Sequence, residues 1–388
     1  MHLRSIMAKT GQQLKIGFVL DGGLERPDGV QQYILSLGEY FSSLGHEVRH
    51  IVAGEVPSNI KNAYSFGKAI GVNSNGNRLK IPLFSSGRKI RSFLSEEKFD
   101  VLHIQTPYSP MMGERFVFKA GKNVAVIGTY HIIPYNFILS VGNKLLGAWC
   151  HFSLKRFDKM LSVSSAAQKV CLSDFRVKSE VLPNVIDFNK FYATKPAAKN
   201  ESKVRILFLG RLVPRKGCMT LLEAINSMDN VKDRIEVVIC GQGPLEGKLK
   251  KFVADNDLGS IVTFKGFISE ESKPAMLASA DISVFPASGG ESFGIVLLEA
   301  MASGKAVVLA GNNAGYASVM SPKPELLFDH SDPKSLAQKI DYYLNNESKR
   351  REDAKWCSDY ARGFDVKVVG DKLLDIYRFY VYKRNQDV

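Results

Sequence analysis

The residues from Ser288 to Gly304 read SGGESFGIVLLEAMASG. The segment begins as a polar, glycine-containing turn and continues as a predicted helix whose faces are nearly all apolar, which is typical of a buried helix. Two carboxylates interrupt it, Glu291 in the turn and Glu299 within the helix. Because a buried carboxylate needs a partner, both side chains are predicted to bind something. The helix start at Phe293 and Gly294 adds backbone N–H groups and a positive dipole end, which suit a phosphate.

Sugar hydroxyl groups are one kind of partner for these carboxylates. Glu299 lies deeper and is placed to accept two hydroxyl protons, as from a ribose. Glu291 lies in the loop and is placed to do the same for a second polyol. The alternative is a core helix with a capping glutamate, and the segment alone leaves both interpretations open.

Buried strands and helices alternate on both sides of this segment. The strands are predicted at residues 15–20, 48–53, 100–104, 124–128, 159–163 and 179–182, and again at 205–210, 235–240, 261–264, 282–286 and 306–309. Such alternation argues for parallel sheets with helices on both faces. The polar residues 192–203 contain a proline and are typical of a linker.

The fold class that follows is α/β, with two doubly wound Rossmann-like domains that face each other across a cleft. A chain of 388 residues is long enough for two such cores. We expect residues 1–195 to form an N-terminal domain and residues 196–364 to form a C-terminal domain. The final helix, residues 365–388, is expected to pack back on the first domain.

Composition narrows the partners and the compartment. The net charge of +13 favours an anionic partner, which can be a nucleic acid, a nucleotide or an acidic membrane surface. No nucleic-acid-binding motif accompanies the charge, so no nucleic acid partner is expected. Five scattered cysteines without a CxxC pair indicate a reducing cytoplasm. No window of about 20 residues is free of charge, so no membrane span is expected.

A second polar turn follows the predicted strand at 205–210. Residues 210–217 read GRLVPRKG, and their cations are expected at the carboxyl end of that strand, where α/β folds bind ligands. Arg211 as a planar fork and Lys216 as a point charge suit a diphosphate. A solvated basic turn is the alternative.

Three further patterns each have two interpretations. Residues 241–247 read GQGPLEG, but no acidic residue ends the following strand, so a tight turn is favoured over a dinucleotide fingerprint. The DND sequence at 255–257 lies at a predicted helix end, where a solvated turn is favoured over a metal site, and no metal is predicted. His103 and His131 each are expected to follow a strand, where a histidine serves either as a structural hydrogen-bonding group or as a site residue.

Several of these motifs occur together in the order of one known family. They are Gly210-Arg211, Arg215-Lys216-Gly217, Gly241-x-Gly-Pro244, Gly266-Phe267-Ile268 and Glu291-Ser-Phe-Gly-(x)4-Glu299. The chain resembles the retaining glycosyltransferases of the GT-B fold, in the large group related to sucrose and glycogen synthesis. The two glutamates, an E-x7-E motif, are the most specific part of this resemblance.

The resemblance implies that the domain at 196–364 binds the nucleotide-sugar and that the domain at 1–195 lies on the acceptor side. It also implies roles for residues in the C-terminal half. Arg211 and Lys216 would hold the diphosphate of a nucleotide-sugar, Glu299 the ribose, and Glu291 the hydroxyls of the donor sugar. The backbone of Phe293, Gly294 and Ile295 would add contacts to the donor, and the base would lie at Phe267 and Ile268.

In the N-terminal half, the family pattern Gly-Gly-Val appears here with Asp28 in place of the first glycine. Gly29 would therefore be the glycine close to the diphosphate. Thr129-Tyr130-His131 is similar to the family's Thr-x-His segment, so His131 would approach the transferred sugar.

Within the family, the chain is most similar to the phosphatidylinositol mannosyltransferases, as in Gly29-Val-Gln-Gln32 and Gly289-Gly-Glu-Ser-Phe-Gly-Ile-Val296. Arg78 and Gln31 are candidate ligands of the acceptor. Arg88, Lys89 and Arg91, next to Ile90, Phe93 and Leu94, predict an interfacial helix at an anionic membrane. Residues 137–157, which mix aromatic and basic side chains, are a second candidate for a membrane surface.

The implied reaction moves a hexosyl group, mannosyl by resemblance, from a GDP- or UDP-sugar to an acceptor hydroxyl with retention of configuration. No further cofactor is expected. The acceptor can be a membrane phospholipid such as phosphatidylinositol, a polysaccharide or a small molecule, and a sugar-nucleotide epimerase or hydrolase of the same fold is a further alternative. The expected location is the cytoplasm, with peripheral attachment to the inner face of the cell membrane.

Overall fold

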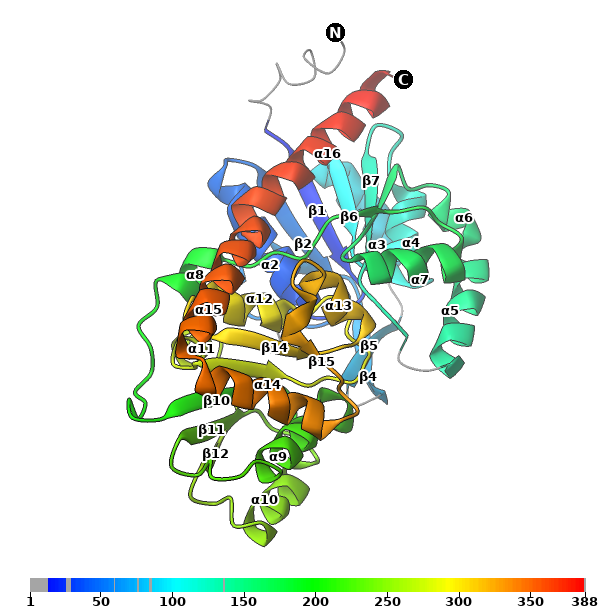
Figure 1. Cartoon of the computed structure of the whole chain (residues 1–388). Helices are drawn as coiled ribbons and strands as arrows, with labels where there is room; N and C mark the ends of the chain where they lie inside the picture. Colours follow the sequence, from blue (N-terminus) through cyan, green and yellow to red (C-terminus); the bar gives the residue numbers. More distant parts are fainter. Residues whose placement is uncertain are drawn as a thin grey trace. The chain divides into compact units, whose positions relative to one another are not determined.

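The chain forms two compact units in a computed structural model, which describes residues 13–25, 29–58, 60–74, 77–83, 86–134 and 137–386 (Figure 1). Unit 1 comprises Met1–Val185 and Val366–Val388, and unit 2 comprises Ile186–Asp365. The chain therefore passes into unit 2 ahead of the boundary expected at 195/196. The polar stretch 192–203 lies within unit 2, where Lys199 pairs with Asp281 at 2.9 Å.

Unit 1 is built on a parallel sheet with the strand order β3-β2-β1-β6-β7-β8-β9. Its strands are β1 (Lys15–Leu20), β2 (Glu47–Val52), β3 (Ala63–Ser65), β6 (Val101–Ile104), β7 (Ala125–Tyr130), β8 (Lys159–Ser162) and β9 (Glu180–Val181). Its helices are α2 (Gly29–Ser43), α3 (Gly87–Glu97), α4 (Met112–Lys119), α5 (Phe137–Trp149), α6 (His151–Leu154), α7 (Ser165–Phe175) and α16 (Val366–Gln386).

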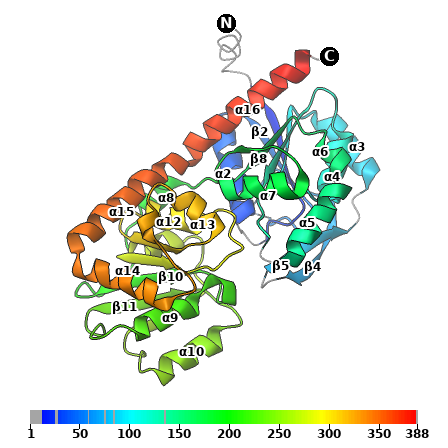
Figure 2. The same ribbon diagram turned by 45° about the vertical axis from the view of Figure 1, so that its right-hand side comes forward.

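The alternation of side chains along β1 explains why helices cover both faces of this sheet. Ile16 and Phe18 belong to a core that includes side chains of α2 and α16, whereas Val19 belongs to a core with α3 and α4. A strand that is apolar on both faces is buried on both faces. The final helix α16 thus lies in unit 1, beside α2 (Figure 2). It also contacts β7.

Residues 54–86, expected to be loops with short strands, contain an antiparallel hairpin as well as β3. The hairpin pairs β4 (Lys68–Ser74) with β5 (Asn77–Leu83), with Lys68 opposite Leu83. Arg78 is a residue of β5, and its side chain lies outside the described part of the structure. Asp28 also lies outside the described residues.

Unit 2 repeats the α/β pattern on a second parallel sheet with the order β12-β11-β10-β13-β14-β15. Its strands are β10 (Val204–Leu209), β11 (Ile235–Cys240), β12 (Val262–Gly266), β13 (Ile282–Phe285), β14 (Val307–Gly311) and β15 (Leu327–Phe328). Its α-helices are α8 (Phe188–Tyr192), α9 (Cys218–Asn226), α10 (Glu246–Asp255), α11 (Lys273–Ala278), α12 (Ile295–Ala302), α13 (Ala314–Met320), α14 (Pro333–Asn345) and α15 (Glu347–Ala361). The prediction of two doubly wound α/β units is confirmed.

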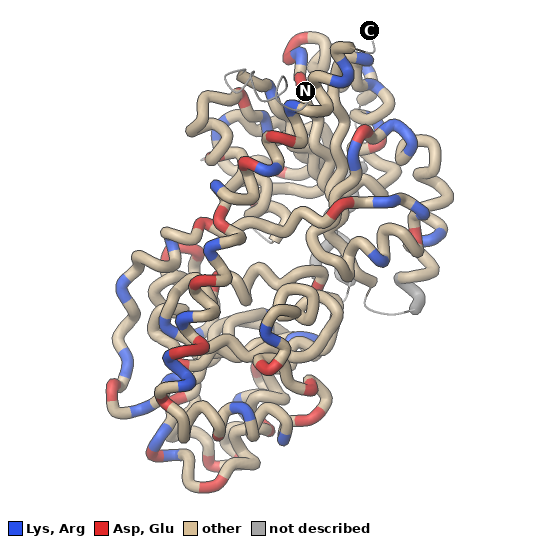
Figure 3. The backbone as a smooth tube through the Cα atoms, turned by 45° about the horizontal axis from the view of Figure 1, so that its top comes forward, with Lys and Arg blue, Asp and Glu red and all other residues tan. Residues whose placement is uncertain are grey.

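The surface charge follows no simple division between the units. Lys and Arg are spread along both units and interspersed with Asp and Glu (Figure 3). Among the residues that the structure describes, no helix combines the length and the hydrophobicity needed to cross a bilayer.

Candidate functional site

The candidate site lies at the carboxyl edge of the sheet in unit 2. Because the strands are parallel, the loops that follow β10, β11, β12 and β13 emerge at the same edge. Backbone hydrogen bonds join them: Gly210 N–H donates to Cys240 C=O at 2.9 Å, and Gly241 N–H donates to Gly266 C=O at 2.7 Å. The motifs that are separate in sequence are therefore neighbours in space.

The glycine at 241 is required by this close approach of two loops. Its φ of +142° is in a region that other residues rarely adopt, and a Cβ atom there would lie 1.9 Å from the carbonyl oxygen of Gly210. This geometry supports the interpretation of residues 241–247 as a tight turn rather than as a dinucleotide fingerprint.

Glu291 is held by two cations from the loop after β10. Its carboxylate forms an ion pair with Arg215 and accepts a hydrogen bond from it, and Lys216 Nζ lies 2.9 Å from Glu291 Oε1. The backbone supports the pairing, because Ser288 N–H donates to Arg215 C=O at 2.9 Å. Burial works to raise the pKa of Glu291, but Lys216 and Arg215 outweigh it and hold the pKa below its ordinary value. A carboxylate and two cations therefore stand together at this edge.

Arg215 is a residue whose part in this cluster the sequence did not reveal. It lies in the quoted basic turn, but only Arg211 and Lys216 had been given roles there. Arg211 directly follows Gly210 and is partly exposed. The sequence did indicate that Glu291 needs a partner. Which of Arg211, Arg215 and Lys216 supplies it depends on the path of the turn.

Glu299 has a partner that was also missed. Lys273 Nζ, at the start of α11, lies 2.6 Å from Glu299 Oε1 and 2.8 Å from Glu270 Oε2. The side chains of Lys273 and Glu299 are each only 7% exposed. Burial opposes the ammonium charge, but Glu299 and Glu270 raise the pKa of Lys273 above its ordinary value. One oxygen of Glu299 is therefore engaged by the protein itself.

The start of α12 has the geometry of an anion site. Gly294 is its N-cap with a φ of +104°, and no side chain caps the helix there. A Cβ atom on Gly294 would lie 2.6 Å from Tyr316 Cε1, so the ring of Tyr316 fixes this turn. Phe293 is buried and packs edge-on against Phe364 with ring centroids 5.9 Å apart. The first N–H groups of α12 are thus presented by a rigid turn.

The other residues predicted to bind the donor differ in exposure. Phe267 directly follows β12 and is 72% exposed, while Ile268 is half-buried. Ile295 is the first residue of α12. An aromatic side chain this exposed is able to stack on a flat ligand.

In unit 1, His131 directly follows β7 and is buried. Its Nε2 lies 2.9 Å from Gln105 Oε1, and its ring packs edge-on against Tyr33 at 5.4 Å. Because the amide oxygen of Gln105 is an acceptor, Nε2 carries the proton in this arrangement. Burial lowers the pKa of His131 to about 3, so the imidazole is neutral. Gln105, which the sequence did not single out, orients this ring.

His103 does not follow its strand, as was expected of this residue, but lies inside the strand that was predicted at 100–104. It lies within β6, fully buried, with Nδ1 2.5 Å from Tyr377 Oη and Nε2 2.6 Å from Thr129 Oγ1. Burial, with a smaller contribution from His131, lowers the pKa of His103 to about 3. Its role is structural, because it joins α16 to the central sheet.

Two further N-terminal candidates lie at the start of α2. Gly29 is its first residue and is exposed. Gln31 Nε2 donates to Gly23 C=O at 3.1 Å, while its buried Oε1 finds no hydrogen-bond partner among the described residues. Gln31 thus retains one unused acceptor next to the loop after β1.

The basic helix α3 differs from the expected interfacial helix. Arg88, Lys89 and Arg91 are exposed, as an anionic surface would require. Its apolar side, however, faces the protein: Ile90 is fully buried, and the ring of Phe93 packs 4.8 Å from that of Phe66. The helix therefore presents basic side chains to solvent. Its large apolar side chains Ile90, Phe93 and Leu94 pack in or against the core of unit 1 and are not presented for insertion into a membrane.

The DND sequence lies at the end of α10. Asp255 is exposed and pairs with Lys251 of the same helix at 2.9 Å, and Asp257 has a φ of +54° in the turn that follows. This is the arrangement of a solvated helix end, which was the favoured interpretation.

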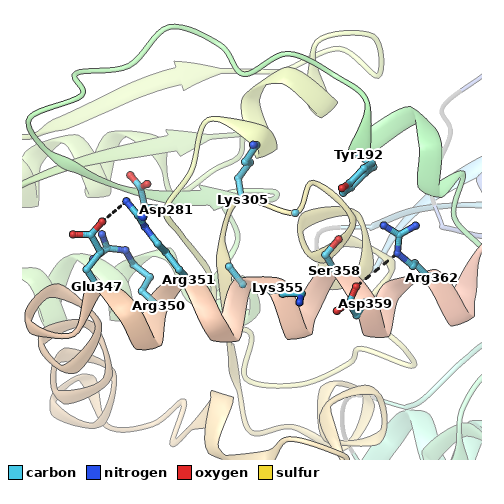
Figure 4. Close-up of a pocket in the computed structure, with 12 residues that line it drawn as sticks. Tyr192, Asp281, Lys305, Glu347, Arg350, Arg351, Lys355, Ser358, Asp359 and Arg362 are labelled. Atoms are coloured by element: carbon cyan, nitrogen blue, oxygen red, sulfur yellow. Dashed lines mark ion pairs between the residues drawn. The ribbon is translucent and has the colours of Figure 1, made fainter.

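A pocket of about 390 Å³ lies elsewhere on unit 2, between α15 and the turn at 304–305 (Figure 4). Its carboxylates are already paired, Glu347 with Arg351 at 2.5 Å and Asp359 with Arg362 at 3.8 Å. The described residues that line it do not include Lys216, Glu291 or Glu299. We therefore place the candidate site at the sheet edge and not in this pocket.

Both units match family models of glycosyltransferases. Residues 27–190 match the family model described as Glycosyltransferase Family 4, and residues 191–363 match the one described as Glycosyl transferases group 1. A phosphatidyl-myo-inositol mannosyltransferase of Propionibacterium freudenreichii is 31% identical over 94% of this chain and 94% of its own length. The protein of that name from Mycolicibacterium smegmatis is 28% identical over 94% of this chain and 93% of its own length.

Solved structures agree on the fold. The crystal structure of Anabaena HepE in complex with UDP has a TM-score of 0.74 and 16% sequence identity, and the match covers 94% of this chain and 99% of HepE. At this identity the likeness shows a shared fold, which is the GT-B arrangement expected from the motifs.

Proposed function

Since the chain belongs to the group 1 glycosyltransferases of the GT-B fold, close to the phosphatidyl-myo-inositol mannosyltransferases, we propose that it transfers a mannosyl group from a nucleoside-diphosphate sugar to a lipid hydroxyl with retention of configuration. The observation that carries the proposal is the cluster of Glu291, Arg215 and Lys216 beside the uncapped start of α12. Cations and helix N–H groups suit a diphosphate, and a carboxylate suits sugar hydroxyls.

Each residue at the sheet edge has a proposed role toward the donor. Lys216, with Arg211, neutralises the diphosphate, and the backbone of Phe293, Gly294 and Ile295 supplies N–H donors. Glu291 accepts hydrogen bonds from the transferred sugar, and Glu299 uses the oxygen not engaged by Lys273 for the ribose. Phe267 and Ile268 flank the base. On unit 1, Gly29 toward the diphosphate and His131 toward the hexose remain proposals that rest on the family resemblance.

The chemistry follows from where charge develops. As the bond between C1 of the sugar and the phosphate oxygen breaks, negative charge accumulates on the leaving diphosphate. Lys216, Arg211 and the positive end of α12 stabilise that charge, a contribution that is usually the largest in such reactions. No separate nucleophile is assigned, and the acceptor hydroxyl attacks from the face that the leaving group vacates while the departing phosphate takes its proton. We propose that these protein groups make a metal unnecessary.

The acceptor proposal rests on the relatives and on the surface of unit 1. The names of the relatives from Propionibacterium freudenreichii and Mycolicibacterium smegmatis specify phosphatidyl-myo-inositol and mannose. Exposed Arg88, Lys89 and Arg91 on α3 suit an anionic membrane surface. We propose peripheral attachment to the inner face of the cell membrane, with Arg78 and Gln31 as candidate ligands of the acceptor.

The direct test is transfer from radiolabelled GDP-mannose to vesicles that contain phosphatidylinositol. UDP-glucose and UDP-N-acetylglucosamine serve as competing donors, since UDP occupies the structurally similar HepE. Labelled glycolipid from GDP-mannose supports the proposal, and NMR of the product reports its anomeric configuration. Donor turnover at the same rate without any acceptor would instead indicate an epimerase or a hydrolase.

Substitutions at the sheet edge test the site itself. Glu291→Gln and Lys216→Ala are each expected to lower kcat/KM by about 10²–10³, the usual effect of removing one group that stabilises the transition state. The matched control is Lys250→Ala, which removes a lysine from an exposed ion pair with Glu246 in the same unit. Full activity of either site variant would refute the assignment.

A further inference from the structure

Helices α5 and α6 present large apolar side chains to solvent on one side. Leu145 is 69% exposed, and Trp149 and Phe152 are each 72% exposed. Val141, one turn earlier, is 42% exposed. The four-residue spacings of Val141, Leu145 and Trp149 place these side chains on the same side of α5. Phe152 lies on α6, which contacts α5. We call these four residues the α5–α6 stripe.

The opposite side of α5 shows why the stripe faces outward. Gly147 is buried there, and a Cβ atom on it would lie 2.6 Å from the carbonyl oxygen of Asp174 on α7. Cys150, which follows α5, is also buried and donates its S–H to Tyr108 C=O at 3.3 Å. Leu146 is partly buried. Among the side chains of α5 that the structure describes, Gly147 thus allows a close backbone contact with α7, whereas Leu145 and Trp149 face solvent.

The apolar surface continues onto α4, which contacts both α6 and α3. Phe118 of α4 is 43% exposed, and the guanidinium of Arg156 lies 5.5 Å from the centre of its ring. In Figure 1, α5 and α6 lie next to each other at the right-hand side of unit 1. Several large apolar side chains exposed on neighbouring helices are typical of a binding surface.

The charged residues of α5, α6 and the turn that follows are all basic. Residues 137–157 contain Lys144, Lys155 and Arg156 and no aspartate or glutamate, and all three cations are exposed. Apolar side chains including a tryptophan, bordered by lysine and arginine, are the composition of helices that lie in the interface of an anionic membrane. A partner with only an acidic, polar surface would match the cations but would not bury the rings of Trp149 and Phe152, whereas the interfacial region of a bilayer does both.

We infer that the α5–α6 stripe inserts into the interfacial region of an anionic phospholipid bilayer. This inference rests on the proposed function, because an enzyme that acts on a lipid acceptor must reach it at a membrane. It assigns the two components of membrane binding to different helices. The cations of α3 attract the surface, and Leu145, Trp149 and Phe152 provide the apolar contact that α3 lacks.

The chain contains two tryptophans, and this allows a direct measurement. Trp356 lies in unit 2, where it stacks on Tyr360, so the Trp356→Phe variant leaves Trp149 as the single reporter. Its emission is measured with vesicles of phosphatidylcholine and phosphatidylglycerol, without donor and without phosphatidylinositol. We expect a blue shift, protection from acrylamide, and quenching by lipids brominated in the upper part of the acyl chains. Unchanged emission and unchanged acrylamide access at saturating vesicle concentration would overturn the inference.

Substitutions locate the contact within the stripe. Leu145→Ser and Phe152→Ser are each expected to reduce the vesicle partition coefficient about tenfold. This is the size of change expected when a large apolar side chain no longer leaves water on binding. Leu44→Ser is the matched control, since Leu44 is 49% exposed in unit 1 but lies at the end of α2. An equal loss in all three variants would contradict the inference.

Two outcomes separate this inference from its alternatives. If Trp149 is already protected from acrylamide without vesicles, and the chain sediments as a dimer, the stripe is a contact between two copies and the inference is wrong. Transfer to a detergent-dispersed acceptor, measured in Leu145→Ser, separates the two proposals. Intact transfer with lost vesicle binding leaves the proposed function standing, whereas intact vesicle binding of a chain that transfers no sugar overturns the function alone.

Discussion

The buried ion pair between Lys273 and Glu299 is expected to contribute more to the stability of unit 2 than an exposed ion pair of similar length. Lys273→Met keeps most of the apolar stem but leaves Glu299 without its cation at a position that is only 7% exposed. Two unit charges 2.6 Å apart attract by about 6 kcal/mol at an effective dielectric constant of about 20. Part of this is offset because lysine no longer has to be desolvated. We therefore expect unit 2 to lose about 3–5 kcal/mol of its free energy of unfolding.

Substitution of the other partner of the ion pair is expected to lower the free energy of unfolding by less. In Glu299→Gln, Lys273 retains Glu270, whose Oε2 lies 2.8 Å away, so the cation is not left alone. We expect a loss of about 1–2 kcal/mol, which is typical of one impaired buried hydrogen bond. The matched control is Lys250→Met, because Lys250 and Glu246 are 2.7 Å apart but exposed. That change is expected to alter the free energy of unfolding by less than about 1 kcal/mol.

The assay is equilibrium unfolding in urea with a probe confined to unit 2. In a Trp149→Phe background the emission comes from Trp356 on α15, and circular dichroism follows the whole chain. A loss below about 1 kcal/mol in Lys273→Met would refute the reasoning, as it lies well outside the range for broken buried pairs. A loss in Glu299→Gln equal to that in Lys273→Met would refute the role given to Glu270.

Three further predictions concern other positions. Gly294→Ala is expected to cost at least about 1–2 kcal/mol for the left-handed backbone, and to weaken nucleotide binding, because its Cβ atom would meet Tyr316 at 2.6 Å; unchanged calorimetric affinity would contradict this. Tyr377→Phe leaves one nitrogen of buried His103 unpaired and is expected to cost about 1–3 kcal/mol, read from Trp149 emission in a Trp356→Phe background during urea unfolding; a loss within error would contradict it. Burial raises the pKa of Asp21 from 3.8 to about 6, so the folded state holds this proton more tightly and the wild type should lose stability as the pH rises from about 4 to 7, by up to about 3 kcal/mol. Asp21→Asn should remove this loss, and parallel pH dependences of the two unfolding free energies would contradict it.

Much of the fold could be predicted from local sequence patterns. The apolar run at 205–210 became β10, shifted by one residue, and the run at 235–240 became β11 with the same ends. A strand buried on both faces needs a continuous apolar run wherever it lies in the sheet. The hairpin of β4 and β5 was not foreseen beyond short strands, since its pairing depends on the register between two short segments of mixed polarity. The interfacial character of α3 was inferred from composition, and the structure shows its apolar residues turned toward the core.

The candidate site was predictable in its motifs but not in its partners. Glu291 and Glu299 stood out because carboxylates in an apolar segment require counter-charges. The sequence does not show which cations pair with them. Strands β11, β12 and β13 lie between Lys216 and Glu291 in the sequence, and Lys273 begins a different helix from the one that carries Glu299. Arg215 and Lys216 are adjacent, and only the path of the turn brings both to the same carboxylate.

The sequence by itself determined the α/β class, the order of the strands along the chain, the glycine-rich turns and the identity of the groups available for chemistry, because these depend on local periodicity and residue type. The tertiary structure decided which lysine holds Glu299, which cations share Glu291, that His103 joins α16 to the sheet, and that α5 turns Trp149 outward. These choices depend on pairs of residues brought together by packing. Their free energies are set by burial and distance, which a linear sequence does not specify.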